Sequence, residues 1–151
     1  MRKKLPGFIA LISLIVIGIS GVSSCNKSGD SSSNSSFTWT YGTTSYTANF
    51  KGAYLTWSLT PVIMGGTGTQ QNSPGTGPTI ALSSFSAGSY NLTTSPNSIR
   101  YIDDLGFTLL SATGTVNITA YSNNQISGNF SATLSNSVAL SGSFANIPVN
   151  P

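Results

Sequence analysis

A strict alternation of apolar and polar residues through the last third of the chain constrains the fold more than any other feature. The alternating segments are 116–120, 126–134 and 138–144, and short turns at Ser122–Asn124 and Ser135–Ser137 separate them. A period of two places the apolar side chains on one face of a strand, and a slip of one residue would move them all into water. The pattern predicts a three-stranded antiparallel meander with one dry and one wet face.

The composition opposes long helices. Ser, Thr, Asn and Gly make up nearly half of the chain, and Glu is absent. Ser, Thr and Asn compete for backbone hydrogen bonds, and Gly costs about 1 kcal/mol at a helical position. We therefore expect strands throughout the folded part.

The first half of that part also alternates. Segments 37–41 and 46–50 predict a hairpin, and Lys51–Gly52 is expected to turn the chain into a third strand over 53–59 that ends at Pro61. On that third strand the shared apolar face is formed by Leu55, Trp57 and Leu59.

The middle of the chain is less regular. Met64–Pro78 lacks apolar periodicity and is expected to be a long loop. Short strands are expected at 79–82, 89–92 and 99–102, while 107–110 is ambiguous. About 8–9 strands at this spacing predict an all-β fold, a single antiparallel β-sandwich or flattened barrel. An eight-stranded barrel with a ligand cavity is the alternative.

The amino-terminal segment has the pattern of an export signal. Met1–Lys4 is cationic, and the largely apolar run of 12 residues at Phe8–Ile19 has the length of a signal-peptide core, short of the roughly 20 residues that span a bilayer. Val22–Cys25 ends in the only cysteine of the chain and resembles a bacterial lipobox. The resemblance implies cleavage before Cys25 and lipid attachment to its sulfur. An uncleaved transmembrane helix over 5–22 is the alternative.

These features divide the chain into three expected parts: a lipoprotein signal peptide at 1–24, a lipidated cysteine with a disordered tether at 25–36, and an all-β domain at 37–151. The tether has no apolar residue to bury and reaches roughly 20 Å as a flexible coil. Several acyl chains on one residue hold a protein stably at a membrane. The expected location is the cell envelope, with the lipid in the bacterial outer membrane and the domain facing the periplasm or the surface.

Three segments of the carboxyl-terminal region support a further resemblance. They are Thr113–Thr119 (GTVNIT after the threonine), Ile126–Leu134 (ISGNFSATL) and Ser141–Phe144 (SGSF). With the lipobox, they resemble a group of small Bacteroidetes envelope lipoproteins of unknown function. The resemblance implies the all-β fold and the envelope location, and it supplies no catalytic residues.

The charge balance argues against nucleic-acid binding. Three of the six cations belong to the expected signal peptide, which leaves three cations against three aspartates and a net charge of zero. Without a basic patch, the main source of affinity for phosphates is missing.

The chain also lacks the usual groups for catalysis. It has no histidine, so abundant serines have no imidazole base, and Lys51 is the one lysine of the expected domain. Asp103–Asp104 are neighbours that face opposite ways on a strand, so a solvated turn explains them better than a catalytic or calcium-binding pair. We therefore expect no enzyme activity and no cofactor or metal.

Aromatic residues are the remaining candidates for a binding site. Trp39, Tyr54 and Trp57 lie near the start of the expected domain, and exposed aromatics can stack on sugars or form a partner contact. Trp39 and Trp57 occupy inward-facing positions of the alternation and are expected in the core, whereas Tyr54 is expected on the surface. The sequence thus predicts a non-catalytic, membrane-anchored structural or interaction module whose partner is an envelope protein or a glycan. The alternative is a binder of glycans or lipids that uses an aromatic patch or a barrel interior.

Overall fold

The computed structural model describes residues 34–150, and the part it describes contains ten strands and no helix. This confirms the all-β prediction. The predicted signal peptide and Cys25 lie outside the described residues. No helix in the described range is long and apolar enough to cross a membrane. The strands are β1 (Ser36–Tyr41), β2 (Thr44–Thr47), β3 (Phe50–Leu55), β4 (Pro61–Gly66), β5 (Gly77–Ala81), β6 (Gly88–Asn91), β7 (Ser98–Ile102), β8 (Thr108–Ser122), β9 (Gln125–Leu134) and β10 (Ala139–Asn150).

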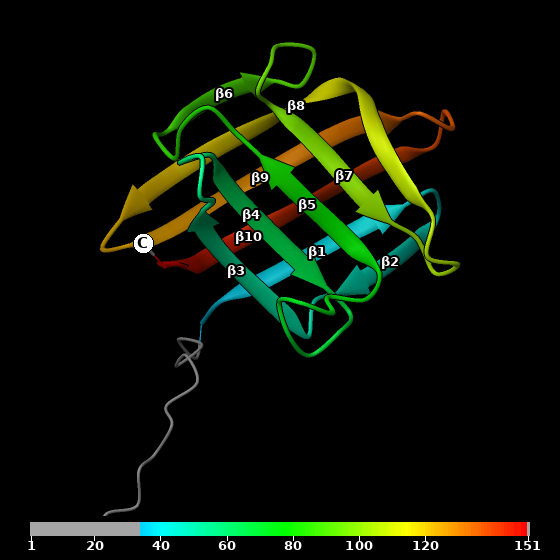
Figure 1. The fold of residues 1–151 in the computed structure, drawn as a ribbon, viewed down its shortest axis with the longest axis horizontal. Coiled ribbons are helices and arrows are strands. Elements are labelled where there is room, and N and C mark those ends of the chain that lie inside the picture. The colour runs from blue at the N-terminus through cyan, green and yellow to red at the C-terminus, as the bar shows by residue number, and fades with distance from the viewer. Residues whose placement is uncertain (1–33, 151) are drawn as a thin grey trace, which may run out of the picture.

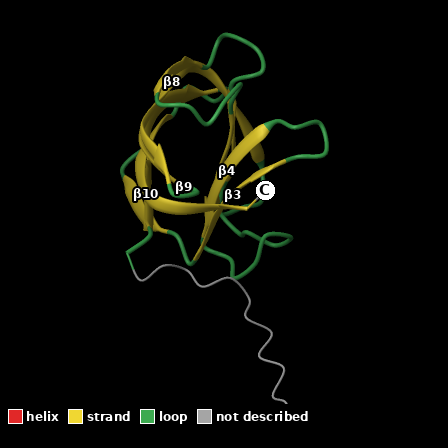
Figure 2. Cartoon of the chain, turned by 90° about the vertical axis from the view of Figure 1, so that its left-hand side faces the viewer, coloured by secondary structure: helices red, strands yellow, loops and turns green. Residues whose placement is uncertain are grey.

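Seven of these strands close into a barrel in the order β3, β4, β5, β7, β8, β9, β10 and back to β3. Figure 2 shows the strands arranged as a ring. Neighbours pair antiparallel except at the closing contact, where Val149 and Asn150 of β10 pair parallel with Ala53 and Tyr54 of β3. The expectation of a sandwich is therefore wrong, and the flattened-barrel alternative describes the architecture better.

Closure depends on two long strands that change partners along their length. β8 pairs with β7 at its start and with β9 from Ser111 on, and β10 leaves β1 before it reaches β3. Register shifts interrupt the β8–β9 ladder between Ser111 and Thr113 and the β9–β10 ladder between Phe144 and Ile147. Because a bulge bends its strand and increases the local twist, these irregularities turn two sheet regions into one closed wall.

The other three strands extend the sheet beyond the closed barrel. The β1–β2 hairpin continues the sheet from β10, and β6 lies along the outer edge of β8 (Figure 1). Gly42 sits in the β1–β2 turn with φ +60, a backbone conformation that glycine adopts without a steric penalty.

The β1 strand packs its apolar face across the interior. Phe37 stacks on Phe144 at 5.7 Å between ring centroids and lies edge-on to Trp39 at 6.1 Å. Its ring also covers Gly65 of β4, where an added Cβ would lie 2.6 Å from Cδ1 of Phe37. The remaining core is aliphatic and aromatic and includes Ile63, Ile80, Leu82, Ile99, Tyr101, Val116, Ile126, Phe130, Leu134, Leu140 and Ile147.

The strand directions define two ends of the barrel. We call the end where β1 begins the proximal end; it also carries the β3–β4 turn (Thr56–Thr60), the β8–β9 turn (Asn123–Asn124) and the end of β10. The opposite, distal end carries the β1–β2, β7–β8 and β9–β10 turns. In Figure 1 the start of β1, the β3–β4 turn and the end of β10 lie on the left, and the β7–β8 turn lies on the right.

The predicted meander is confirmed, with β8 beginning earlier than expected at Thr108 and with Asn123 and Asn124 in its turn at positive φ. The predicted third strand is wrong in its bounds. Lys51 lies inside β3 instead of in a turn, and β3 ends at Leu55, so Trp57 lies in a turn. The expected loop 64–78 is shorter than predicted, because β4 continues to Gly66 and β5 begins at Gly77.

Candidate functional site

The three aromatic candidates from the sequence do not form one site. Trp39 is 2% exposed and belongs to the core, as its alternation predicts. Tyr54 is half-buried at the end of β3, so its expected surface position is only partly realised. Trp57 is fully exposed in the β3–β4 turn, and its expected place in the core is wrong.

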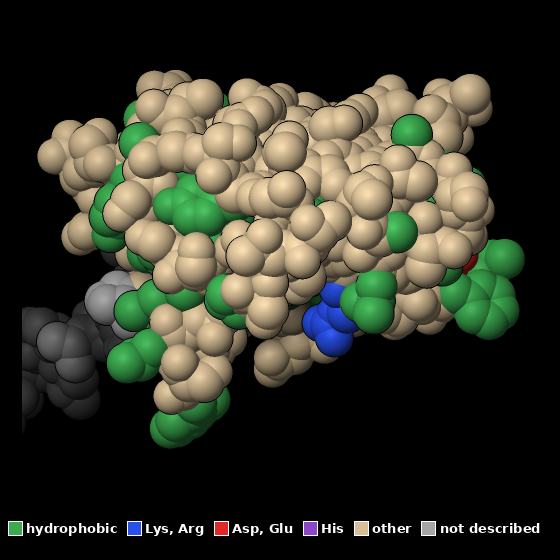
Figure 3. Space-filling view, turned by 90° about the horizontal axis from the view of Figure 1, so that it is seen from above, with side chains coloured by type: hydrophobic (Ala, Val, Ile, Leu, Met, Phe, Trp, Pro, Cys, Tyr) green, Lys and Arg blue, Asp and Glu red, His purple; other side chains and the backbone are tan. Residues whose placement is uncertain are grey.

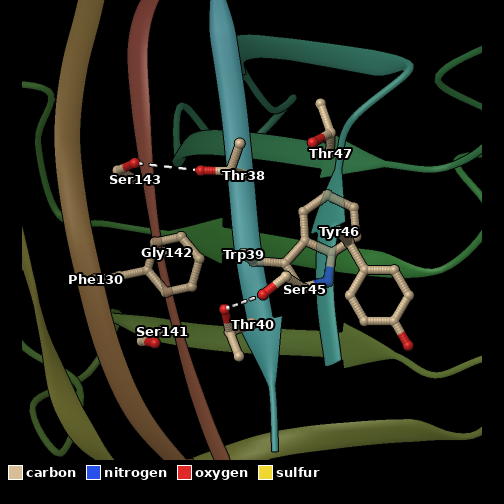
Figure 4. Close-up of a pocket in the computed structure, with 10 residues that line it drawn as sticks. All are labelled: Thr38, Trp39, Thr40, Ser45, Tyr46, Thr47, Phe130, Ser141, Gly142 and Ser143. Carbon is tan, nitrogen blue, oxygen red and sulfur yellow. Dashed lines mark hydrogen bonds between the residues drawn. The ribbon is translucent and has the colours of Figure 1, made fainter. Parts of the chain in front are cut away.

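The structure instead places a groove on the outer face of β1, β2 and β10 (Figure 4). Its volume is about 500 Å³. Outward-facing hydroxyl side chains dominate the lining, and two pairs are within hydrogen-bond distance: Thr38 with Ser143 at 3.4 Å and Thr40 with Ser45 at 3.1 Å. The other lining residues are Trp39, Tyr46, Thr47, Phe130, Ser141 and Gly142.

The strand register explains this lining. Thr38 pairs with Ser143 and Thr40 with Ser141, so the polar positions of β1 and β10 fall on the same side of the sheet. The same outer rows continue across β9 to Asn129 and Ser131. Hydroxyl and amide groups both donate and accept hydrogen bonds. The groove can therefore bind an uncharged polar ligand, but neither hydroxyl pair includes a base that would make a nucleophile.

Tyr46 is the one titratable side chain among the lining residues, and it is hydrogen-bonded to the β7–β8 turn at the distal end. Its hydroxyl donates a hydrogen bond of 2.8 Å to Oδ2 of Asp104, and Thr76 Oγ1 donates one of 2.8 Å to Oδ1. The hydrogen bond to the Asp104 carboxylate, with a smaller contribution from burial, raises the pKa of Tyr46. The phenol therefore holds its proton and is unsuited to act as a base.

Beneath the groove lie two polar atoms that find no hydrogen-bond partner among residues 34–150: Nε1 of Trp39 and the hydroxyl of Tyr101. Trp39 stacks on Tyr46 at 5.3 Å, and Tyr101 packs on Tyr41 at 4.7 Å. Burial of the Tyr101 hydroxyl raises its pKa, because the charged phenolate is disfavoured in the core. These four aromatic residues therefore pack as two ring pairs.

The acidic pair lies in a turn, as the sequence predicts. Oδ1 of Asp103 accepts hydrogen bonds from the backbone N–H groups of Leu105 and Phe107 at 3.0 and 2.8 Å, which fixes the β7–β8 turn. Within the described range, no three His, Cys, Asp or Glu side chains come close enough to hold a metal ion.

The surface of the domain is poor in charge. Residues 34–150 contain two cations, Lys51 and Arg100, and two anions, Asp103 and Asp104. Figure 3 shows one face of the molecule, which is covered largely by uncharged polar groups with small, separate apolar patches.

Sequence reasoning missed the groove and the Tyr46–Asp104 contact. The outward hydroxyls were visible as the polar half of the alternation, but the pairing of β1 with β10 joins residues about 100 positions apart, such as Thr38 and Ser143. No protein-family model matches the sequence, and no curated protein or solved structure is detectably similar to it.

Proposed function

We propose that this chain is a non-catalytic lipoprotein, anchored in the bacterial outer membrane, whose all-β domain serves as a structural or interaction module. The observation that carries the proposal is the packed interior of the barrel. Phe37, Trp39 and Tyr101 are each no more than 2% exposed, and the Phe37 ring packs against both Phe144 of β10 and Gly65 of β4. A hollow barrel would favour a carried ligand. A filled one favours a protein that acts through its outer surface and its position.

The chemistry of the surface also supports a role without catalysis. Four hydroxyls of the groove form two pairs, Thr38 with Ser143 and Thr40 with Ser45. The proton of Tyr46 is held by its bond to Asp104. Nucleophilic catalysis by a hydroxyl needs a neighbouring base. A hydrolytic activity of the purified protein that Lys51→Ala or Asp103→Ala abolished would contradict the proposal.

The location is tested by replacing the predicted lipidated residue. Cys25→Ser should move the protein from the outer-membrane fraction to the soluble fraction or leave it as an unprocessed precursor in the inner membrane, because the sulfur that carries lipid is gone. Ser24→Ala is the matched control, since it keeps a small residue before the cysteine. If Cys25→Ser stays in the outer membrane as the wild type does, lipid anchoring is contradicted.

The groove supports a second candidate, the binding of an uncharged glycan. Rows of hydroxyls on a sheet can bond sugar hydroxyls, and Tyr46 adds an aromatic edge. Titration of the full chain with neutral oligosaccharides should then give saturable binding that Thr40→Val weakens. Thr119→Val, exposed on β8 away from the groove, is the control. Equal affinity of the two variants would contradict binding in the groove.

A further inference from the structure

We propose that the β3–β4 turn, Thr56–Thr60, is a membrane-contact tip whose Trp57 and Leu59 side chains enter the interfacial layer of the bilayer. The inference deepens the proposed function and rests on it, because the lipid on Cys25 would hold the tip close to that bilayer. The binding partner that we assign to the tip is thus the lipid surface itself.

The tip and the end of β3 beside it expose three apolar side chains. Trp57 is fully exposed, and Leu59 and Leu55 are 74% and 40% exposed. Tryptophan is the side chain most typical of membrane interfaces, where an apolar ring and a polar N–H meet lipid and headgroups together. Three exposed apolar residues within five positions form a compact projection.

Hydrogen bonds within the turn hold this projection in shape. The backbone N–H of Thr56 donates to the carbonyl of Thr60 at 3.0 Å, and that of Leu59 donates to the carbonyl of Thr56 at 2.8 Å. Oγ1 of Thr56 also accepts from the N–H of Thr60 at 3.1 Å. A tip that is ordered before binding loses little conformational entropy on contact with a surface.

Leu59 occupies a backbone conformation that disfavours leucine. Its φ is +59, in the left-handed region where residues other than glycine are strained. The side chain is 74% exposed, so it gains little burial within the domain to offset this strain. Burial in lipid would offset it, which agrees with the observation that strained residues concentrate at functional sites.

The chain enters the domain at the same end. The carbonyl of Asn34 contacts Nδ2 of Asn146, and β1 begins where Ser36 pairs with Ala145, while the last residues of β10 pair with Ala53 and Tyr54 beside the tip. Asn34 is nine residues from Cys25. Nine residues reach at most about 32 Å even when fully extended, so a lipid on Cys25 would keep the proximal end near the bilayer.

The distribution of charge favours the proximal end as the membrane-facing one. Lys51 lies near the start of β3 at the distal end, Arg100 lies in the middle of β7, and Asp103 and Asp104 lie in the distal β7–β8 turn. The proximal turns and strand ends of the described domain therefore carry no charged side chain. Contact with lipid avoids the cost of removing a charge from water.

The β7–β8 turn is a natural comparison. Leu105 and Phe107 are exposed there, at 80% and 63%, but they lie at the distal end beside two carboxylates. Exposure alone would make both turns equal candidates. Position relative to the start of β1 and the absence of charge select the β3–β4 turn.

Tryptophan fluorescence tests the proposal. The full-length lipoprotein is reconstituted in vesicles of phosphatidylethanolamine and phosphatidylglycerol, with and without brominated acyl chains. The chain has two tryptophans, so the difference between the wild type and Trp57→Phe isolates Trp57 from the buried Trp39. We expect brominated lipid to quench the Trp57 emission strongly. We also expect aqueous acrylamide to quench this emission several-fold less in vesicles than in detergent micelles. Leu59→Ser should reduce the lipid quenching, and Leu105→Ser should leave it unchanged.

Mass and fluorescence together distinguish failure of the membrane-contact tip from failure of the proposed lipid anchor. The mass of the same preparation reports whether Cys25 carries lipid. A lipidated protein whose Trp57 is open to acrylamide and unquenched by brominated lipid overturns the tip and leaves the lipoprotein intact. A protein with an unmodified Cys25 overturns both. Equal loss of quenching in Leu59→Ser and Leu105→Ser also contradicts the assignment to the β3–β4 turn.

Discussion

The Tyr46 hydroxyl donates a 2.8 Å hydrogen bond to Oδ2 of Asp104, across 58 residues of sequence. This bond joins β2, which lies outside the closed ring, to the β7–β8 turn of the barrel. Both groups lie near the surface, and solvent competes for them. A double-mutant cycle of Tyr46→Phe and Asp104→Asn in urea unfolding should therefore give a coupling of about 1 kcal/mol. Additive effects of the two substitutions would show that the bond contributes nothing to stability.

The buried hydroxyl of Tyr101 predicts a loss of stability at alkaline pH. Burial raises the pKa of Tyr101 above the ordinary value of 10.0. The folded state thus holds a proton that the unfolded chain releases, so this contribution is fully present below pH of about 10 and is lost as the pH rises toward the folded-state pKa. Tyr101→Phe should match or slightly exceed the wild type in unfolding free energy at neutral pH, since it removes an unpartnered hydroxyl, and should lose less at high pH. Identical alkaline losses in both proteins would contradict this account.

Gly65 should resist substitution, because the Phe37 ring lies against it. A Cβ at this position would lie 2.6 Å from Cδ1 of Phe37, so Gly65→Ala should lower the unfolding free energy by about 1–3 kcal/mol. Gly52→Ala is the matched control: Gly52 lies on the neighbouring strand β3, and its nearest contact is an ordinary 3.7 Å. Denaturant unfolding of the two variants compares them directly. Similar stabilities would mean that β1 does not pack on β4 as described.

Substitution of Leu59 distinguishes a role in folding from a role in membrane contact. Replacing it with glycine relieves the left-handed strain at φ +59 and removes almost no buried surface. Leu59→Gly should therefore keep or raise the unfolding free energy in solution, by up to about 1 kcal/mol. The same variant should weaken the contact of Trp57 with lipid. A clear loss of stability in thermal unfolding would show that Leu59 serves the fold instead.

The carboxyl-terminal meander was predictable because its alternation is long and its turns have suitable residues. Ile126 to Leu134 keeps the period without interruption, and Asn123 and Asn124 tolerate the positive φ of the tight turn before it. By contrast, Leu55, Trp57 and Leu59 alternate over only five residues. A turn closed by threonine hydroxyls produces the same spacing, so the pattern could not separate a strand from a turn.

The sequence left a sandwich and a barrel undecided and gave no sign of the groove, for a different reason. Barrel closure and the groove both depend on where β8 and β10 change partners, which is set by the irregularities near Ser111 and Phe144. Alternation specifies which face of a strand is buried, but not which strand lies beside it. The contact of Tyr46 with Asp104 likewise follows from topology, since nothing in either local segment indicates the other.

The mass of the mature protein extracted from membranes shows whether Cys25 carries lipid and where the chain begins. We expect a chain that begins at Cys25 and is heavier than its sequence by a diacylglyceryl group on sulfur and an acyl chain on the new amino terminus. A chain that retains Met1–Ser24 and carries a free thiol at Cys25 would contradict this expectation.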